Sequence, residues 1–288
     1  MISPRLNDFN FVFFGTDEFA VAVLAALAAA GLWPALIITT PDRPRGRGQV
    51  LTPPPVKLWA EENKIDYEQP PKLPESYKLK AKSLSADEEG YKLFLVASYG
   101  QIIPPEILTL PKHGVLNIHP SLLPKWRGPT PIQSAILAGI GETGVSLMLV
   151  DEQIDHGPIL KIKSYKLKAK SFPIIRTQLA KLGAQLFIEI LPAWLARKIK
   201  PVPQNHAQAT FTQKIKKEDG LIDLTDDPQI NYRKFLALTP RPGIYCFINN
   251  QRMIITAAEF KDGQFVITRV KPDSRREMTW SDFQRGLK

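Results

Sequence analysis

Two polar side chains suited to chemistry on a carbonyl group lie close together in the stretch NIHPSLLPKWRGPTPIQSAI, residues 117–136. Asn117 and His119 are separated by one residue, and side chains at positions i and i+2 of a strand point to the same side. Pro120 then ends the strand because it has no N–H to donate. An amide N–H beside an imidazole can stabilise an oxyanion, and the imidazole can move protons near neutral pH. The simpler alternative is a histidine with a purely structural role, which caps the end of the strand by bonding to a carbonyl oxygen.

A third polar group follows in the stretch VDEQIDHGPIL, residues 150–160. Asp151 and Asp155 come just after a predicted strand that ends at Val150. If that strand lies beside the one that carries His119, the Asp155 carboxylate can reach the imidazole, orient its ring and raise its pKa. The alternative is an aspartate that only bonds to its own turn.

A metal site is a further possibility, with His119, Asp155 and His156 as ligands. Two adjacent residues rarely bind one ion, and no third ligand has a recognisable spacing from them. We therefore expect no metal.

The segments around these residues alternate between predicted strands and helices. Strands are predicted over residues 9–15, 34–40, 92–98, 114–119 and 143–150, and helices from Thr16 or Asp17 to Gly31 and over residues 56–63, 131–138 and 172–199. This order predicts an α/β fold with a Rossmann-like, doubly wound, mostly parallel sheet. Such a sheet binds its ligand at the carboxyl ends of its strands, where the three polar side chains would lie. A dinucleotide or ATP is not expected, because the first turn has only Gly15 and no Walker-type motif occurs.

The composition and the hydrophobic pattern of the sequence change near residue 207. The segment KPVPQNHAQATFTQKIKKEDG, residues 200–220, is rich in proline and polar residues, and short alternating apolar runs follow it. We expect a catalytic domain over residues 1–200, a linker over 201–206 and a small C-terminal antiparallel β-barrel domain over 207–288.

Composition favours a cytoplasmic protein. Hydrophobic residues make up 44% of the 288 residues, enough for a core. The apolar run from Phe19 to Ala30 is shorter than the roughly 20 residues of a membrane span, and acidic residues precede it, so no membrane partner or export signal is expected. The single cysteine, Cys246, suits a reducing compartment.

The net charge of +10 lies in the second half, because basic and acidic residues are equally numerous in residues 1–150. A one-sided basic surface fits a polyanion such as nucleic acid, and a merely solubilising surface is the alternative. Arg43, Arg45 and Arg47 alternate with proline and glycine in a segment without an apolar period. These arginines could each clamp a phosphate group, or belong to a solvated loop.

In combination, these stretches resemble the formyltransferases that use 10-formyltetrahydrofolate. The resemblance implies that Asn117, His119 and Asp155 are catalytic. It also implies that the SLLP segment contacts the folate through Ser121, Leu122, Leu123 and Pro124. In this family the substrate amine is itself the nucleophile, so the enzyme needs no serine or cysteine to attack the carbonyl.

Within that superfamily the sequence is most similar to the methionyl-tRNA formyltransferases, along almost the whole chain. The stretches that carry the similarity are FFGTDEFA, TTPDRPRGRGQVLTPPPVK, WRGPTPIQ, KIKKEDGLIDL and MTWSDFQRG. The second of these, residues 39–57, resembles the basic loop that reaches the acceptor end of the tRNA, with Arg47 at the position of the loop arginine. The C-terminal domain would correspond to the small tRNA-contacting barrel.

The resemblance implies formyl transfer from 10-formyltetrahydrofolate to the α-amine of initiator methionyl-tRNA, by a monomer without a metal. One alternative is a formyltransferase that acts on a small amine, such as glycinamide ribonucleotide or an amino-sugar nucleotide. A second alternative is a non-catalytic RNA-binding protein with the same fold.

Overall fold

The chain forms two compact units in the computed structural model, which describes residues 9–46, 48–73, 91–168 and 170–286. The first unit comprises Met1–Arg127, Gly144–Tyr165 and Arg176–Thr210, and the second comprises Gly128–Thr143, Lys166–Ile175 and Phe211–Lys288. The boundaries expected from the sequence, with a linker at 201–206, remain a prediction.

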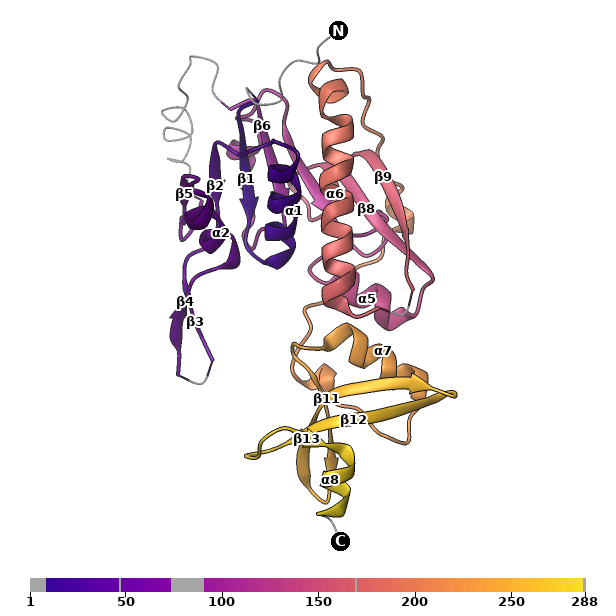
Figure 1. The fold of residues 1–288 in the computed structure, drawn as a ribbon. Coiled ribbons are helices and arrows are strands. Elements are labelled where there is room, and N and C mark those ends of the chain that lie inside the picture. The colour runs from indigo at the N-terminus through magenta and orange to yellow at the C-terminus, as the bar shows by residue number, and fades with distance from the viewer. Residues whose placement is uncertain (1–8, 47, 74–90, 169, 287–288) are drawn as a thin grey trace. The chain divides into compact units, whose positions relative to one another are not determined.

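The first unit is built on a seven-stranded sheet in the order β5-β2-β1-β6-β7-β8-β9 (Figure 1). The strands are β1 (Phe11–Gly15), β2 (Leu36–Ile38), β5 (Tyr67–Glu68), β6 (Leu93–Ala97), β7 (Val115–His119), β8 (Glu142–Leu149) and β9 (Ile159–Lys166). The strands from β5 to β7 pair in parallel, and β8 runs antiparallel to β7. The predicted Rossmann-like, mostly parallel sheet is therefore confirmed. The lysine-rich strand β9, which the sequence analysis did not include, forms one edge of this sheet.

The first helix begins directly after β1. α1 (Glu18–Ala29) is capped by Asp17, whose Oδ1 accepts hydrogen bonds from the N–H groups of Phe19 at 2.9 Å and Ala20 at 3.3 Å. The other oxygen accepts from Ser98 Oγ at 2.7 Å, just beyond the end of β6. Burial is the main influence on this carboxyl and raises its pKa, although these hydrogen bonds act in the opposite direction. Asp17 thus ties the ends of β1 and β6 together at the carboxyl edge of the sheet.

Apolar side chains cover both faces of the sheet. On one face, Val12 and Phe14 pack into a cluster with Ile107 of α4 (Pro105–Leu108). On the other face lies α6 (Phe172–Leu195), where Phe187 contacts Phe11 with ring centroids 6.4 Å apart (Figure 1).

Gly183 allows α6 to lie directly on β7 and β8. A Cβ at this position would overlap the side chain of Ile118 and come within 3.2 Å of Val145. Ile118 lies between Asn117 and His119, so the helix supports the strand from the side opposite these polar groups.

The second unit contains a four-stranded antiparallel sheet in the order β10-β11-β12-β13. Its elements are α5 (Pro131–Ala138), α7 (Pro228–Leu238), β10 (Ile244–Ile248), β11 (Gln251–Lys261), β12 (Gln264–Pro272), β13 (Met278–Thr279) and α8 (Trp280–Arg285). Cys246 is buried in this core, and burial raises the pKa of its thiol. The predicted antiparallel C-terminal structure is confirmed, and α5 has the bounds expected from the sequence. α7 was not predicted, because only a β-rich domain was expected over residues 207–288.

Within the described residues, no helix combines the length and the apolar character that a membrane crossing requires.

Candidate active site

Asn117 and His119 lie at the carboxyl end of β7, in the middle of the first sheet. β7 pairs with β6 and β8, and His119 stands opposite Ser146 of β8. His119 is 5% exposed, whereas Asn117 is half-buried. The alternation expected for a strand therefore places both side chains on one side, with the amide nearer to solvent.

Asp155 reaches both of these side chains from the loop between β8 and β9. Its Oδ1 lies 3.3 Å from His119 Nδ1 and accepts a hydrogen bond from Asn117 Nδ2 at 3.4 Å. The Asp155 side chain is 12% exposed. The structure thus brings together all three residues that the sequence analysis selected as catalytic.

The loop that carries Asp155 has an unusual backbone conformation. Asp155 has φ of +51°, in the left-handed region that side-chain-bearing residues seldom occupy. Two residues later, a Cβ on Gly157 would overlap the carbonyl oxygen of Leu149. Glycine at 157 therefore lets the loop turn back tightly against the end of β8.

His119 lies between two hydrogen-bond acceptors, an arrangement that favours the cationic ring. Its Nδ1 faces the Asp155 carboxylate, and its Nε2 lies 3.1 Å from the carbonyl oxygen of Trp126. Neither oxygen can donate, so both contacts are hydrogen bonds only when both ring nitrogens carry a proton. Burial disfavours the charged ring, and Arg127 also lowers the pKa. The charge and hydrogen bond of Asp155, together with the Trp126 carbonyl, outweigh both effects and raise the pKa of His119 above 6.5. The bonding to a carbonyl that the sequence analysis gave as the simpler alternative therefore occurs alongside the contact with Asp155.

The SLLP segment forms a turn fastened to β8. Ser146 Oγ donates to the carbonyl of Ser121 at 2.8 Å and accepts from the N–H of Leu123 at 3.0 Å. Ser121 and Leu123 are buried, whereas Leu122 and Pro124 are half-buried. The latter two therefore present the accessible apolar surface of the turn.

The basic segment forms a hairpin rather than the irregular loop expected from its sequence. β3 (Arg43–Arg45) pairs antiparallel with β4 (Val50–Thr52), and the hairpin projects from the first sheet (Figure 1). Arg43 is exposed, the backbone of Arg45 lies in β3, and Arg47 falls outside the described residues. On the opposite strand, Val50 and Leu51 are 66% and 64% exposed.

A network of polar side chains next to Asp155 was not predicted from the sequence. Arg127 is 3% exposed and Gln204 is 6% exposed, and the two are hydrogen-bonded to each other. Gln204 also bonds to the backbone on both sides of His156. The segment around Gln204 was interpreted as a linker because of its prolines, and nothing local marks Gln204 as buried.

His156 contacts this network through His206. Its Nδ1 lies 2.7 Å from Asp151 Oδ2, and its ring stacks on that of His206. Within the described residues, no group of three or more histidine, cysteine or acidic side chains has the arrangement of a metal site.

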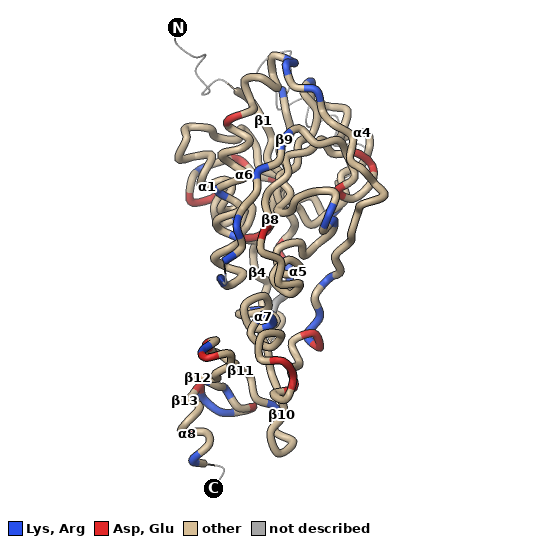
Figure 2. Tube along the Cα trace, turned by 90° about the vertical axis from the view of Figure 1, so that its right-hand side faces the viewer, with Lys and Arg blue, Asp and Glu red and all other residues tan. Residues whose placement is uncertain are grey.

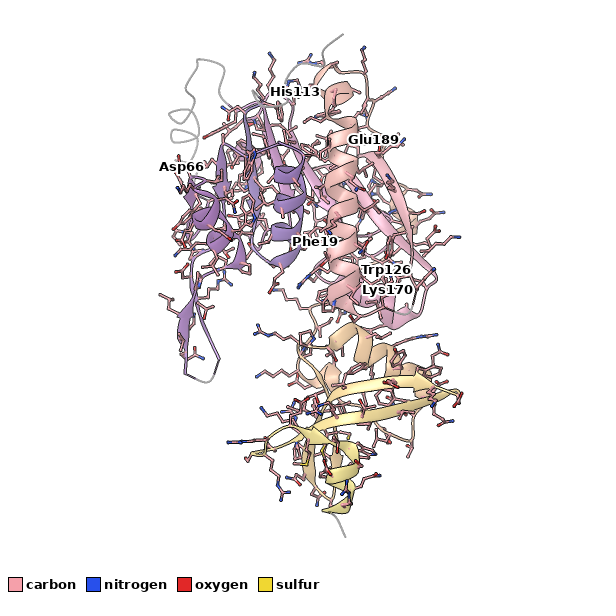
Figure 3. All side chains as sticks on the ribbon, viewed as in Figure 1. Phe19, Asp66, His113, Trp126, Lys170 and Glu189 are labelled. Carbon is pink, nitrogen blue, oxygen red and sulfur yellow. The ribbon has the colours of Figure 1, made fainter. Side chains whose placement is uncertain are left out.

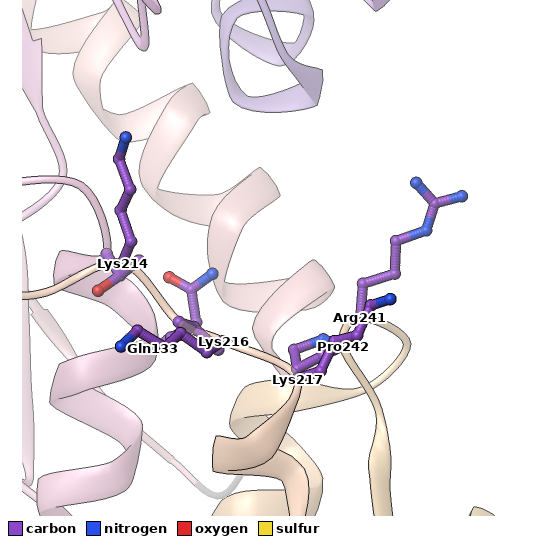
Figure 4. Close-up of a pocket in the computed structure, with 8 residues that line it drawn as sticks. Gln133, Lys214, Lys216, Lys217, Arg241 and Pro242 are labelled. Carbon is purple, nitrogen blue, oxygen red and sulfur yellow. The ribbon is translucent and has the colours of Figure 1, made fainter. Parts of the chain in front are cut away.

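The second unit contains a basic cavity of about 460 Å³ (Figure 4). It is lined by Thr130, Gln133, Lys214, Ile215, Lys216, Lys217, Arg241 and Pro242. Four of these side chains are cationic, and Lys214, Lys216 and Lys217 come from the KIKKEDG stretch. Such a surface suits an anionic ligand with several negative groups. Lysine and arginine also recur along the rest of the Cα trace (Figure 2).

The first unit contains a smaller cavity of about 320 Å³ beside His113 and Trp194. Burial, followed by the charges of Lys112, Arg197 and Lys92, lowers the pKa of His113. Figure 3 shows His113 at the end of the unit opposite to Trp126.

The sequence matches the family model described as "Formyl transferase" over residues 9–191. It also matches "Formyl transferase, C-terminal domain" over residues 214–265. The curated methionyl-tRNA formyltransferase of Halorhodospira halophila is 36% identical over 300 residues, which cover 96% of this chain and 95% of that protein.

Solved structures with the same fold include a methionyl-tRNA formyltransferase and an amino-sugar N-formyltransferase. Methionyl-tRNA formyltransferase from Clostridium thermocellum has a TM-score of 0.59 at 19% identity and covers 92% of this chain and 98% of its own. The N-formyltransferase from Helicobacter canadensis, in complex with folinic acid and dTDP-3-aminofucose, has a TM-score of 0.63 at 17% identity, with coverage of 90% and 95%. The structural similarity covers most of the chain, and the curated relative from Halorhodospira halophila is similar in sequence along nearly its whole length.

Proposed function

This chain belongs to the formyl transferase family, and we propose that it transfers a formyl group from 10-formyltetrahydrofolate to the α-amine of methionyl-tRNA. The observation that supports this function most directly is the convergence of Asn117, His119 and Asp155 at the end of β7. An amide donor and a cationic imidazole suit a reaction in which negative charge develops on a carbonyl oxygen. The product, N-formylmethionyl-tRNA, would serve translation initiation in the cytoplasm, and we propose that the enzyme acts as a monomer.

In the reaction, the amine nitrogen of the substrate bonds to the formyl carbon, and the bond from that carbon to the folate nitrogen breaks. Asn117 Nδ2 donates a hydrogen bond to the oxyanion that forms in between. His119 donates from Nε2 to the same oxygen and helps to protonate the leaving folate nitrogen. For this, the reacting oxygen replaces the Trp126 carbonyl as the acceptor on Nε2. Asp155 stabilises the imidazolium and assists removal of the proton that the attacking amine loses.

We propose that the folate co-substrate contacts the turn formed by Ser121, Leu122, Leu123 and Pro124. The half-buried Leu122 and Pro124 offer an apolar contact, while the bonds from Ser146 keep the turn in place. The buried Ser121 and Leu123 would act through the backbone. These residues supply no metal ligands, and the reaction as derived needs no metal.

We propose that the tRNA is bound by Arg43, Arg45 and Arg47, and that the basic cavity of the second unit contributes further phosphate contacts. Arginine on a projecting hairpin can clamp phosphate oxygens, and the exposed Val50 and Leu51 can pack on sugars or bases.

Replacing Arg43 with alanine should weaken binding of methionyl-tRNA and make its salt dependence shallower. Loss of one phosphate contact lowers the slope of log K against log salt by about 0.7–0.9. The slope is obtained from filter-binding or fluorescence titrations at several salt concentrations.

Arg197→Ala is the matched control, because Arg197 is an exposed arginine that lines the cavity beside His113. An equal change of slope in both variants, or an unchanged slope for Arg43→Ala, would show that Arg43 makes no specific contact with the RNA.

The function is tested by incubating the protein with 10-formyltetrahydrofolate and one of two kinds of acceptor. The first is charged initiator tRNA, and the second is a small amine, either glycinamide ribonucleotide or an amino-sugar nucleotide. Mass spectrometry of the amino acid released from the tRNA should show formylmethionine. Formylation of the small amine alone would assign a different substrate, and no formylation of either would favour a non-catalytic RNA-binding protein.

A further inference from the structure

The two residues that contact the ring nitrogens of His119 both have left-handed backbones. Trp126, whose carbonyl faces Nε2, has φ of +62°, and Asp155, whose carboxylate faces Nδ1, has φ of +51°. Such conformations cost free energy and persist only where the surrounding structure enforces them. The catalytic arrangement therefore requires something that holds these two loops.

One segment, residues 204–210, fastens both loops, and we call it the strap. Thr210 holds the first loop, because its Oγ1 accepts from the N–H of Trp126 and its carbonyl accepts from the N–H of Arg127, both at 2.8 Å. Gln204 holds the second loop, because its Nε2 donates to the carbonyls of Asp155 at 3.0 Å and Gly157 at 2.7 Å.

Arg127 determines which way the Gln204 amide faces. The Oε1 of Gln204 accepts from Arg127 Nη2 at 2.7 Å and from Nε at 3.3 Å. A guanidinium can only donate, so the oxygen of the amide must face it and the NH₂ group must face the two loop carbonyls. Both side chains are buried, and in this setting a reversed amide would leave the carbonyls without donors.

His206, two residues after Gln204 in the strap, contacts the residue that follows Asp155. Arg127 Nη2 donates to His206 Nδ1 at 2.9 Å, and the His206 ring lies parallel to that of His156, with centroids 3.9 Å apart. Desolvation, followed by the charges of His156 and Arg127, lowers the pKa of His206, so this ring accepts as the neutral form.

We propose that Gln204, oriented by Arg127, is a positioning residue that fixes the backbone of Asp155 so that its carboxylate reaches His119. The NH₂ group of Gln204 is responsible for this effect, because it donates the hydrogen bonds to the carbonyls of Asp155 and Gly157. The effect on rate rests on the proposed function, whereas the effect on the ionisation of His119 does not. The charged groups that face His119 are Asp155, which favours the cation, and Arg127, which opposes it.

The test is Gln204→Glu, which keeps the shape of the side chain and the acceptor for Arg127 but replaces the donor with a second acceptor. A carboxylate cannot bond to the carbonyls of Asp155 and Gly157, so the turn should move away from His119. The matched control is Gln208→Glu, the same change at an exposed position of the strap.

The first readout is the titration of His119 in ¹⁵N-histidine NMR spectra, which contain only four histidines. Single replacements of His113, His156 and His206 assign the remaining signal to His119. In Gln204→Glu the midpoint of His119 should fall by about one pH unit or more. The reason is that the Asp155 carboxylate, which favours the cation, has moved away from the ring. The second readout is kcat for formylation, which should fall about 100-fold, the cost of a misplacement of about 1 Å. Gln208→Glu should match the parent in both.

Unchanged titration and kcat in folded Gln204→Glu would overturn the proposal. If that variant does not fold, Gln204→Met removes the donor but keeps Arg127, whose charge also acts on His119 and whose Nη2 still bonds to His206. Gln204→Met should show the same fall in the His119 midpoint, and a parental midpoint would overturn the proposal. Failure of both variants to fold would assign Gln204 to stability instead and would overturn the proposal as well. If the parent protein formylates no methionyl-tRNA, the proposed function fails while the titration still decides the role of Gln204.

Discussion

Replacing Asn117 with alanine should lower kcat for formylation about 100- to 1000-fold, which corresponds to roughly 2.7–4 kcal/mol of lost transition-state stabilisation. The amide is the donor assigned to the oxyanion, and this interaction forms fully only in the transition state. The Kd for methionyl-tRNA should therefore change little. Steady-state kinetics at saturating tRNA, combined with direct binding titrations, separate the two quantities.

Asn117 also donates to Asp155, so an indirect effect must be distinguished from a direct one. If Asn117 acts on the oxyanion itself, the pH profile of the variant keeps the shape of the parent profile. A shifted profile would show that the loss arises from displacement of Asp155. Asn63→Ala is a suitable control, because Asn63 makes one hydrogen bond within α2 (Pro55–Asn63). A collapse of tRNA binding with kcat intact would contradict the assigned role.

Replacing Asp155 with asparagine should lower kcat about 10²- to 10⁴-fold, the range typical of general acid–base groups. The amide keeps the size of the side chain but removes the negative charge that favours the imidazolium. Without that charge, burial and Arg127 act on His119 and should bring its pKa below the ordinary value of 6.5. The alkaline limb of the kcat profile should therefore move to lower pH.

The same substitution should change how stability depends on pH. In the parent, the pKa of His119 is raised by folding, so its contribution to stability is complete below pH 6.5. That contribution is lost as the pH rises through the folded-state pKa. In Asp155→Asn the folded-state pKa is depressed, so protonation of His119 should oppose folding as the pH falls below 6.5. Urea denaturation at several pH values measures this reversal.

Asp262→Asn is the matched control for Asp155→Asn, because Asp262 also has a left-handed backbone, with φ of +50°, and is exposed. It should leave kcat and the pH profile as they are. A parental pH profile in Asp155→Asn would show that the carboxylate does not govern the ionisation of His119.

The parts of the fold that could be predicted are those with strong local patterns. The alternation of buried strands and helices identified β1, β6, β7 and β8, and Pro131 with Gly139 delimited α5. The Asn-x-His spacing and the following aspartate suggested a polar cluster, and the family resemblance then selected Asn117, His119 and Asp155 as catalytic candidates. Their convergence does not follow from strand order alone. β8 runs antiparallel to β7 and ends opposite Leu116, so the following loop must turn back along β7 to bring Asp155 to His119.

The rest depended on contacts between distant segments. The antiparallel direction of β8 is decided by its pairing with β7. β9 was not recognised as a strand because its lysines make the sequence mostly polar. Gln204 and Arg127 are 77 residues apart, and a polar residue among prolines is usually exposed. The group that lies against His119 Nε2 is the backbone carbonyl of Trp126. A backbone acceptor cannot be recognised from the type of the residue.

The lysines of β9 have a consequence for assembly. β9 is the outermost strand of the first sheet, and Lys161, Lys163 and Lys166 are exposed along it. An open strand edge is a template on which another molecule can extend the sheet, and ammonium groups along it repel a second copy of the same strand. Beyond Ile159, which is bonded to Val202, these charges should oppose pairing of β9 with a second copy, and acylation of the amines should weaken that effect.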